Sequence, residues 1–137
     1  MRVSKRILWI TAVAVAIAVA IVAWLIVTSE PAAARSEQVV VPAPTPELER
    51  GRLAYDEFCA ECHGANTVGT DKGPAFLHRI YHPGHHGDGA FLLAAKRGAR
   101  AHHWRFGEMK PVPGLGDAEL EAVVGYIRAV QKANGIF

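Results

Sequence analysis

The N-terminal part of the chain has a hydropathy pattern unlike that of the remainder. From Ile7 to Val27 no residue is charged, and Thr11 is the only polar one. At a rise of about 1.5 Å per residue, a helix of this length extends about 31 Å, close to the thickness of the hydrocarbon core of a bilayer. The pattern therefore predicts an N-terminal transmembrane signal-anchor over residues 1–30.

The charges that flank the apolar run predict its orientation. Arg2, Lys5 and Arg6 precede the run, whereas Glu30 is the first charged residue after it. Basic residues are retained on the cytoplasmic side of a membrane. We therefore expect a single-pass protein of a bacterial-type inner membrane, with a cytoplasmic N-terminus and a periplasmic or extracytoplasmic C-terminal part.

A cleaved signal peptide is the alternative to a retained anchor. Ala32, Ala33 and Ala34 resemble a cleavage site. However, the apolar region of a signal peptide usually runs only about 7–15 residues. Trp9 and Trp24 lie near the two ends of the run, as in the aromatic belts of membrane interfaces, and favour a retained anchor.

A segment rich in proline and alanine follows the apolar run. It contains Pro31, Pro42, Pro44 and Pro46. Such a composition is typical of an extended spacer and not of a packed core. The pattern predicts a flexible linker over residues 31–46 and a separate domain over residues 47–137.

Apolar residues in this domain recur at helical spacing. Thr45 and Pro46 are typical of a helix N-cap and first turn, and acidic residues follow them. One face of this helix leads to the cysteines through Leu48, Gly51, Tyr55, Phe58 and Cys62. Gly51 would allow another helix to approach closely.

Two further helices are predicted in the domain. Asp88 is the expected N-cap of the first helix and Gly98 ends it, whereas the second helix begins at Gly116 or Asp117 and runs toward Asn134. The intervening segments carry Gly-Pro and Pro-Gly pairs and are predicted as loops, with one helical turn near residues 76–80. No strand pattern or repeat is present, so we predict an all-α domain of three to four helices.

The charge balance of the domain bears on its partners. Residues 47–137 contain 11 basic and 11 acidic side chains, so nucleic-acid binding is not indicated. Basic residues gather in one region, however, where Glu108 is the only acidic residue: Lys96, Arg97, Arg100, Arg105 and Lys110. This local basic cluster could attract an acidic protein surface.

The two cysteines of the chain form a Cys-x-x-Cys-His motif with the next residue, His63. In such a motif, Cys59 and Cys62 can attach a haem through thioether bonds while the imidazole binds the iron. The motif also admits a disulfide, as in a thiol oxidoreductase, but that class requires a βαβ context, which the pattern lacks. A zinc site with His78 and His82 fits the ligand spacing, although a Gly-Pro pair interrupts the required helix.

Four stretches together resemble the class I mono-haem c-type cytochromes over nearly all of residues 47–137. They are "GRLAYDEFCAECHG", "KGPAFL", "GEMKPVPGLGDAEL" and "VVGYI". They resemble, in the same order, the N-terminal helix with its haem motif, the GPxL loop, the methionine loop and the C-terminal helix of that family. The resemblance favours haem over the other two chemistries.

The resemblance implies one covalent haem c and a role for each matching residue. Cys59 and Cys62 would form the thioether bonds, and His63 and Met109 would be the axial ligands of the haem iron. The backbone carbonyl of Pro74 would accept a hydrogen bond from the second imidazole nitrogen and orient the ring. The terminal helices would meet through Gly51, Tyr55, Val123 and Tyr126.

The sequence departs from the family pattern in two places. Lys110 separates Met109 from Pro111, where the family usually has proline directly after the methionine. The domain also contains six further histidines: His78, His82, His85, His86, His102 and His103. These imidazoles could bind copper or another metal weakly, and His102 or His103 is the rival of Met109 as an iron ligand.

The resemblance implies a function in electron transfer. Iron with both axial positions filled has no site for a substrate, so we expect a one-electron carrier and not an enzyme. The expected setting is a membrane-associated respiratory or photosynthetic chain, with redox proteins as partners. The alternatives are a haem-containing sensor, a copper-handling accessory protein that uses the histidine-rich loops, or a fixed cytochrome subunit of an oxidase or dehydrogenase complex.

Overall fold

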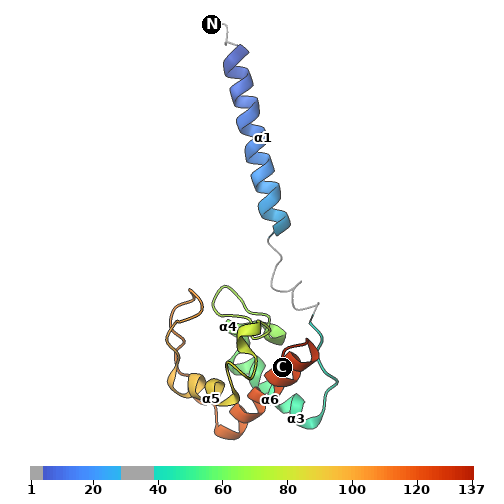
Figure 1. Ribbon diagram of the computed structural model, residues 1–137, viewed down its shortest axis with the longest axis vertical. Helices are drawn as coiled ribbons and strands as arrows, with labels where there is room; N and C mark the ends of the chain where they lie inside the picture. The colour runs from blue at the N-terminus through green and yellow to red at the C-terminus, as the bar shows by residue number, and fades with distance from the viewer. Residues whose placement is uncertain (1–4, 29–38) are drawn as a thin grey trace. The chain divides into compact units, whose positions relative to one another are not determined.

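Residues 5–28 and 39–137 are described in the computed structural model of the chain, with side chains in the first segment at residues 9 and 11–26. The chain divides into two units, Met1–Pro31 and Ala32–Phe137 (Figure 1). The expected signals at residues 1–4 and 29–38, which include Arg2, Glu30 and the alanine cleavage site, lie outside the described residues.

The first unit consists of the helix α1, Lys5–Thr28. It includes the whole apolar run, so the helical conformation predicted for residues 7–27 is confirmed. All of its described side chains are exposed, among them Trp9 and Trp24. Among the described residues, no helix combines the length and the apolar character that crossing a bilayer requires.

The second unit is helical, as predicted. Its α-helices are α3 (Pro46–Phe58), α4 (Ala60–His63), α5 (Asp88–Arg97) and α6 (Asp117–Ala133). Two short 3₁₀ helices, η1 (Ala65–Thr67) and η2 (Arg79–Tyr81), lie between α4 and α5. Within the described residues no strand is present, and the extended pairing consists of one isolated bridge between Ala99 and Met109.

The helix ends follow the capping signals of the sequence closely. The Oγ1 atom of Thr45 accepts a hydrogen bond from the backbone of Leu48 at 3.3 Å, which caps α3 as expected. The carboxylate of Glu119 accepts a bond from the backbone of Gly116 at 3.1 Å and caps α6. The helix α5 is capped by Gly87, one residue before the predicted position, and ends at Gly98 as predicted.

The core of the domain forms where α3 crosses α6. A Cβ atom on Gly51 would lie 2.2 Å from the carbonyl oxygen of Ala122, so the two helices approach too closely for any other residue. Beside this crossing, the rings of Tyr55 and Tyr126 pack with their centroids 5.4 Å apart. The predicted contact between the terminal helices, which also includes the buried Val123, is therefore confirmed.

The chain that leads into α3 is attached to this core. Val39 packs against the core, and Val40 exchanges two hydrogen bonds with the side chain of Asn134, at 3.1 and 2.8 Å. The predicted linker is described from residue 39 onward. This part of it therefore runs along the domain.

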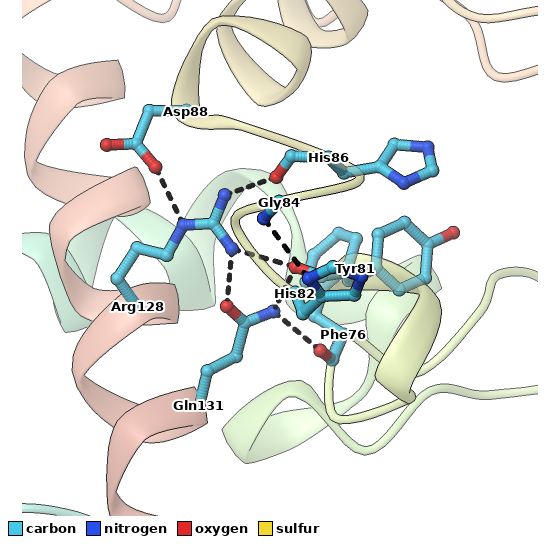
Figure 2. Close-up of polar contacts among 8 residues, drawn as sticks. All are labelled: Phe76, Tyr81, His82, Gly84, His86, Asp88, Arg128 and Gln131. Carbon is cyan, nitrogen blue, oxygen red and sulfur yellow. Dashed lines mark hydrogen bonds and ion pairs between the residues drawn. The ribbon is translucent and has the colours of Figure 1, made fainter. Parts of the chain in front are cut away.

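A polar pair on α6 fixes the long loop before α5 (Figure 2). Arg128 donates hydrogen bonds to the carbonyl oxygens of Tyr81, at 2.8 Å, and His86, and it forms an ion pair with Asp88 at 2.7 Å. Gln131, which is fully buried, donates to the carbonyl oxygen of Phe76 at 2.8 Å. These bonds satisfy carbonyl groups that an irregular loop leaves without partners.

Candidate functional site

The cysteine motif lies at the junction of two helices. Cys59 is both the C-cap residue of α3 and the N-cap residue of α4. The backbone N–H of His63 donates a hydrogen bond to the carbonyl oxygen of Cys59 at 2.9 Å. The hydroxyl of the buried Tyr55 donates to the carbonyl oxygen of Gly64 at 2.8 Å and holds the end of α4. This short helix places His63 toward the interior and leaves Cys62 exposed.

His63 is held in one orientation. Its ring is buried, with 8% of the residue exposed, and Nδ1 lies 3.0 Å from the carbonyl oxygen of Pro74. Because a carbonyl oxygen can only accept, Nδ1 carries the proton and Nε2 keeps a free lone pair. The ring also stacks on Phe76, with centroids 4.2 Å apart.

The environment of His63 favours its neutral form. Burial lowers the pKa of His63, and the hydrogen bond to the Pro74 carbonyl opposes that effect only in part. A neutral imidazole with a free nitrogen is the form that binds a metal. The geometry predicted for His63 and Pro74 is therefore present.

The loop that carries Pro74 is fastened to the cysteine motif. The hydroxyl of Thr70 donates to the carbonyl oxygen of Cys62 at 2.6 Å, and the backbone of Gly69 donates to that of His63 at 2.6 Å. An ion pair between Lys72 and Glu61, at 2.7 Å, joins the same two segments at the surface. The loop and the motif thus form one unit around the imidazole.

A cavity of about 400 Å³ opens beside His63. Cys59, Pro74 and Met109 line it together with His63, whereas Cys62 lies outside the lining. Most of the remaining wall is apolar and comes from α5, α6 and the loops next to them: Phe76, Phe91, Leu93, Ala94, Ala95, Val112, Leu120, Val123, Val124 and Ile127. The extra histidines His86, His102 and His103 lie at the same cavity, as does Trp104.

Met109 reaches the cavity from the loop that follows α5. Its backbone exchanges two hydrogen bonds with Ala99, at 3.0 and 2.9 Å, and its side chain is half-buried. The backbone of Val112 donates to the carbonyl oxygen of Ala95 at 2.8 Å, which attaches the loop to α5. Lys110, the departure from the family pattern, is exposed and leaves these bonds in place.

These residues fit a covalently bound haem. The apolar cavity suits a porphyrin, the imidazole of His63 offers a free nitrogen, and the thioether of Met109 lines the same space. Cys59 and Cys62 are free thiols at the beginning of the motif, without a disulfide between them. Cys59 and Cys62 would therefore hold a haem through thioether bonds, and His63 would bind its iron.

The zinc alternative does not agree with the positions of its ligands. His78 and His82 accept hydrogen bonds through Nδ1 from Ile80 and Gly84, at 3.2 and 3.1 Å. In the described part of the chain, the one group of side chains placed to share a metal contains neither cysteine. Burial also raises the pKa of the Cys59 thiol to about 11, whereas zinc binds thiolates.

Phe76, Arg128 and Gln131 help to build the site, although the motifs of the sequence did not indicate them. Phe76 lies in the stretch "KGPAFL", whose resemblance to the family implies a role for Pro74 alone. The signal for Gln131 was a polar residue four positions after the core residue Ile127, on the buried face of a helix. Such a residue indicates a buried hydrogen-bond network, though its partners follow only from the fold.

Comparison with known families supports the assignment of the site. Residues 48–131 match the family model described as cytochrome c, which is more than half of the chain. Comparison with curated proteins and with solved structures gave no significant match. The matched range contains both cysteines, His63, Pro74 and Met109, and members of the family use covalently bound haem c for electron transfer. The chain therefore belongs to the cytochrome c family.

Proposed function

We propose that the protein is a one-electron carrier with a single haem c bonded to Cys59 and Cys62. In this proposal His63 and Met109 are the axial ligands of the iron. The observation that carries it is that the imidazole and the thioether line one apolar cavity beside the cysteine motif.

The bound haem supplies an iron atom that changes valence by one electron. The protein supplies the environment of that atom. The Pro74 carbonyl holds the His63 ring in one tautomer, and the pairing of Met109 with Ala99 positions the thioether. The apolar walls would shield a bound haem from water, which would disfavour the more highly charged ferric state and raise the reduction potential. If His63 and Met109 both bind the iron, no coordination position would remain for a substrate, and the role that we propose is therefore electron transfer.

Visible spectroscopy and mass spectrometry of the protein, made in a host that attaches haem c, test this proposal. We expect a mass increased by one haem and, in the oxidised protein, the far-red absorption of sulfur bound to ferric haem. Met109→Ala should abolish that absorption and allow carbon monoxide to bind the reduced iron. Val112→Ala removes another side chain of the cavity wall and should do neither.

Three results would contradict the proposal or its details. A colourless protein with the mass of its amino acids would exclude the cofactor. Absence of the far-red absorption from the unchanged oxidised protein, together with no binding of carbon monoxide by its reduced iron, would assign the sixth position to another residue, with His102 and His103 as the candidates that line the cavity. Ready binding of carbon monoxide by the unchanged protein would favour a sensor over a carrier.

The membrane-associated setting is part of the same proposal. The support comes from the apolar run of residues 7–27, from the basic residues before it and from the continuous helix α1, whose described large apolar side chains are exposed. We propose that the apolar run of residues 7–27 anchors the haem domain outside the cytoplasm, where the domain serves a respiratory or photosynthetic chain. The segment between the apolar run and residue 39 then links the domain to this anchor and raises the effective concentration of the domain near its partners.

Fractionation of cells that make the full-length chain tests the anchor. We expect the haem protein to stay with the membranes during an alkaline carbonate wash and to be digested by protease added to spheroplasts. Release by carbonate, or a mature mass that lacks the first 30 or so residues, would contradict a retained anchor. Neither result would affect the assignment of the haem ligands.

The basic cluster near the methionine loop is the proposed docking surface for a redox partner. Lys96, Arg97, Arg100, Arg105 and Lys110 are all exposed. An ion pair with Asp117, at 2.8 Å, engages Lys96, so the other four charges are the main contribution. Electrostatic steering weakens with ionic strength, and we expect the rate of electron transfer to a partner to fall as salt rises. A rate independent of salt would contradict this docking mode.

A further inference from the structure

Three histidines from two separate loops meet at the surface of the domain. His85 and His86 belong to the loop before α5, and His103 belongs to the loop before Met109. Nε2 of His85 lies 3.3 Å from Nε2 of His103, and one ring nitrogen of each of the three residues lies within 4.8 Å of the others. The two Nε2 atoms cannot both carry a proton in this arrangement, because an imidazole N–H only donates and two donors cannot face each other at this distance.

Hydrogen bonds to the backbone separate four of the six extra histidines into two kinds. His78 and His82 accept backbone hydrogen bonds through Nδ1 and act as caps of the loop. His86 and His102 instead place Nδ1 against the carbonyl oxygens of Ile80 and Arg100, at 2.8 and 2.7 Å. In these two residues Nδ1 must donate, so Nε2 is left with a free lone pair. A carbonyl bound to the far nitrogen is the usual support of a histidine that binds a metal.

The loop that carries His85 and His86 is fixed in place. The backbones of both residues donate to the carbonyl oxygen of His82 at 3.0 Å, which closes a tight turn. Arg128 binds the carbonyl oxygen of His86 and the carboxylate of Asp88, and Figure 2 shows the imidazole of His86 pointing away from this arginine. The backbone is thus held from α6 while the ring stays available.

The second loop is joined to the first beside the cluster. The indole nitrogen of Trp104, which follows His103 directly, donates to the hydroxyl of Tyr81 at 3.0 Å. The ring of Tyr81 in turn packs against His86, with centroids 5.1 Å apart. The two loops therefore bring their histidines together through contacts that do not involve the imidazole nitrogens of the cluster.

We propose that His85, His86 and His103 form a second metal site, distinct from the haem iron, for a divalent transition-metal ion of the zinc and copper class. Zinc binds imidazole nitrogen at about 2.0–2.1 Å, which places two ligands of a tetrahedral ion about 3.3–3.4 Å apart. The separation of His85 and His103 already matches this value. His86 offers the third nitrogen, within 4.8 Å of the other two.

The ligand set selects the class of ion. Zinc and copper favour imidazole, whereas magnesium and calcium require oxygen ligands, and the cluster consists of histidines alone. Three imidazoles leave a fourth position for water or an exchangeable ligand. The ring of His102 lies 4.2 Å from that of His103 between centroids and can stabilise the site from its edge.

Metal uptake by the full-length purified protein tests the site. We expect saturable binding of one equivalent of Zn²⁺, and of Cu²⁺ in a separate titration, and no comparable binding of Ca²⁺ or Mg²⁺. The affinity should fall at least tenfold in a variant with both His85→Ala and His103→Ala. The matched control carries His78→Asn and His82→Asn, which removes the same number of imidazoles but keeps an oxygen acceptor in the place of each Nδ1, and should bind as the unchanged protein does.

Elemental analysis after dialysis gives the number of bound ions, and far-ultraviolet circular dichroism shows whether each variant is folded. If the double variant does not fold, the single variant His103→Gln, at an exposed position, replaces it in the comparison. Absence of saturable uptake by the unchanged protein would overturn the proposal. Equal affinity in the His85 and His103 variant, or equal loss in the control, would overturn it as well.

Failure of this proposal and failure of the proposed electron-transfer function can be told apart. Haem attachment is read from the visible spectrum and the mass, whereas metal uptake is read from the zinc or copper content. Zn²⁺ has no visible absorption of its own and leaves the haem spectrum interpretable. A haem protein that binds no zinc contradicts only the histidine site.

Discussion

The imidazole of His63 lies 3.0 Å from the carbonyl oxygen of Pro74, in a loop that passes directly over the cysteine motif. The residue before Pro74 makes this approach feasible. A Cβ atom on Gly73 would lie 2.8 Å from the carbonyl oxygen of Cys62 and 3.3 Å from the His63 ring. The carbonyl that orients the imidazole therefore depends on a residue without a side chain.

Gly73→Ala should move the Pro74 carbonyl away from His63. We expect the free energy of unfolding of the haem protein to fall by about 1–3 kcal/mol, because the added methyl group meets backbone atoms that cannot yield easily. We also expect a changed reduction potential, since the hydrogen bond tunes the ligand. Denaturant unfolding and a redox titration measure the two effects. The control is Gly89→Ala, where a Cβ atom has no neighbour within 4 Å; an equal loss in both variants would contradict the argument.

Gly98→Ala should disturb the ligation by Met109. Gly98 has a φ of 77°, which favours glycine, and a Cβ atom there would lie 2.4 Å from the carbonyl oxygen of Met109. We expect the far-red absorption of the oxidised protein to decrease strongly. Gly107→Ala is the matched control, because Gly107 also has a positive φ, of 87°, but has open space around it. Retention of the full absorption in Gly98→Ala would show that the loop adapts.

Tyr55→Phe should destabilise the domain at neutral pH by about 1–3 kcal/mol. The substitution leaves the buried carbonyl oxygen of Gly64 without its 2.8 Å hydrogen bond. Urea unfolding at pH 7 measures the loss.

The same substitution should change the alkaline stability. Burial raises the pKa of Tyr55 in the folded protein. Below the unfolded-state pKa of tyrosine, near 10, the neutral hydroxyl contributes its full stabilisation of the folded protein. As the pH rises above that value, the hydroxyl ionises in the unfolded state first, and the stabilisation is lost. The difference between the unchanged protein and Tyr55→Phe should therefore shrink between pH 9 and about 11. A difference that stays constant over this range would mean that the hydroxyl does not titrate on unfolding.

Removal of both thiols should prevent the domain from folding cooperatively. The variant with Cys59→Ala and Cys62→Ala cannot attach haem, and the apolar walls of the cavity of about 400 Å³ then lack the group they pack against. We expect no cooperative thermal transition by circular dichroism. A compact variant with a sharp transition would show that the contact of α3 and α6 suffices for folding. The single variant Cys62→Ala, at the exposed position, allows the contribution of one thioether bond to be separated.

The order of helices was accessible from the sequence because its signals are local. Thr45 caps α3 and Glu119 caps α6 through bonds to residues three positions away, and such bonds depend only on the neighbouring chain. The glycine that permits the helix crossing was also visible, since Gly51 lies on an apolar face at helical spacing. The Cys59, Cys62 and His63 motif is equally local, because its chemistry requires the three residues next to one another.

The tertiary structure decided which of the remaining polar residues work together. The sequence presented six extra histidines without distinguishing them. Only the packing of two loops separates the caps His78 and His82 from the cluster of His85, His86 and His103. Likewise, Arg128 and Gln131 bind carbonyl groups up to 55 positions away. Contacts over such distances along the chain carry no local signal, because they exist only once the helices have packed and fixed the loops between them.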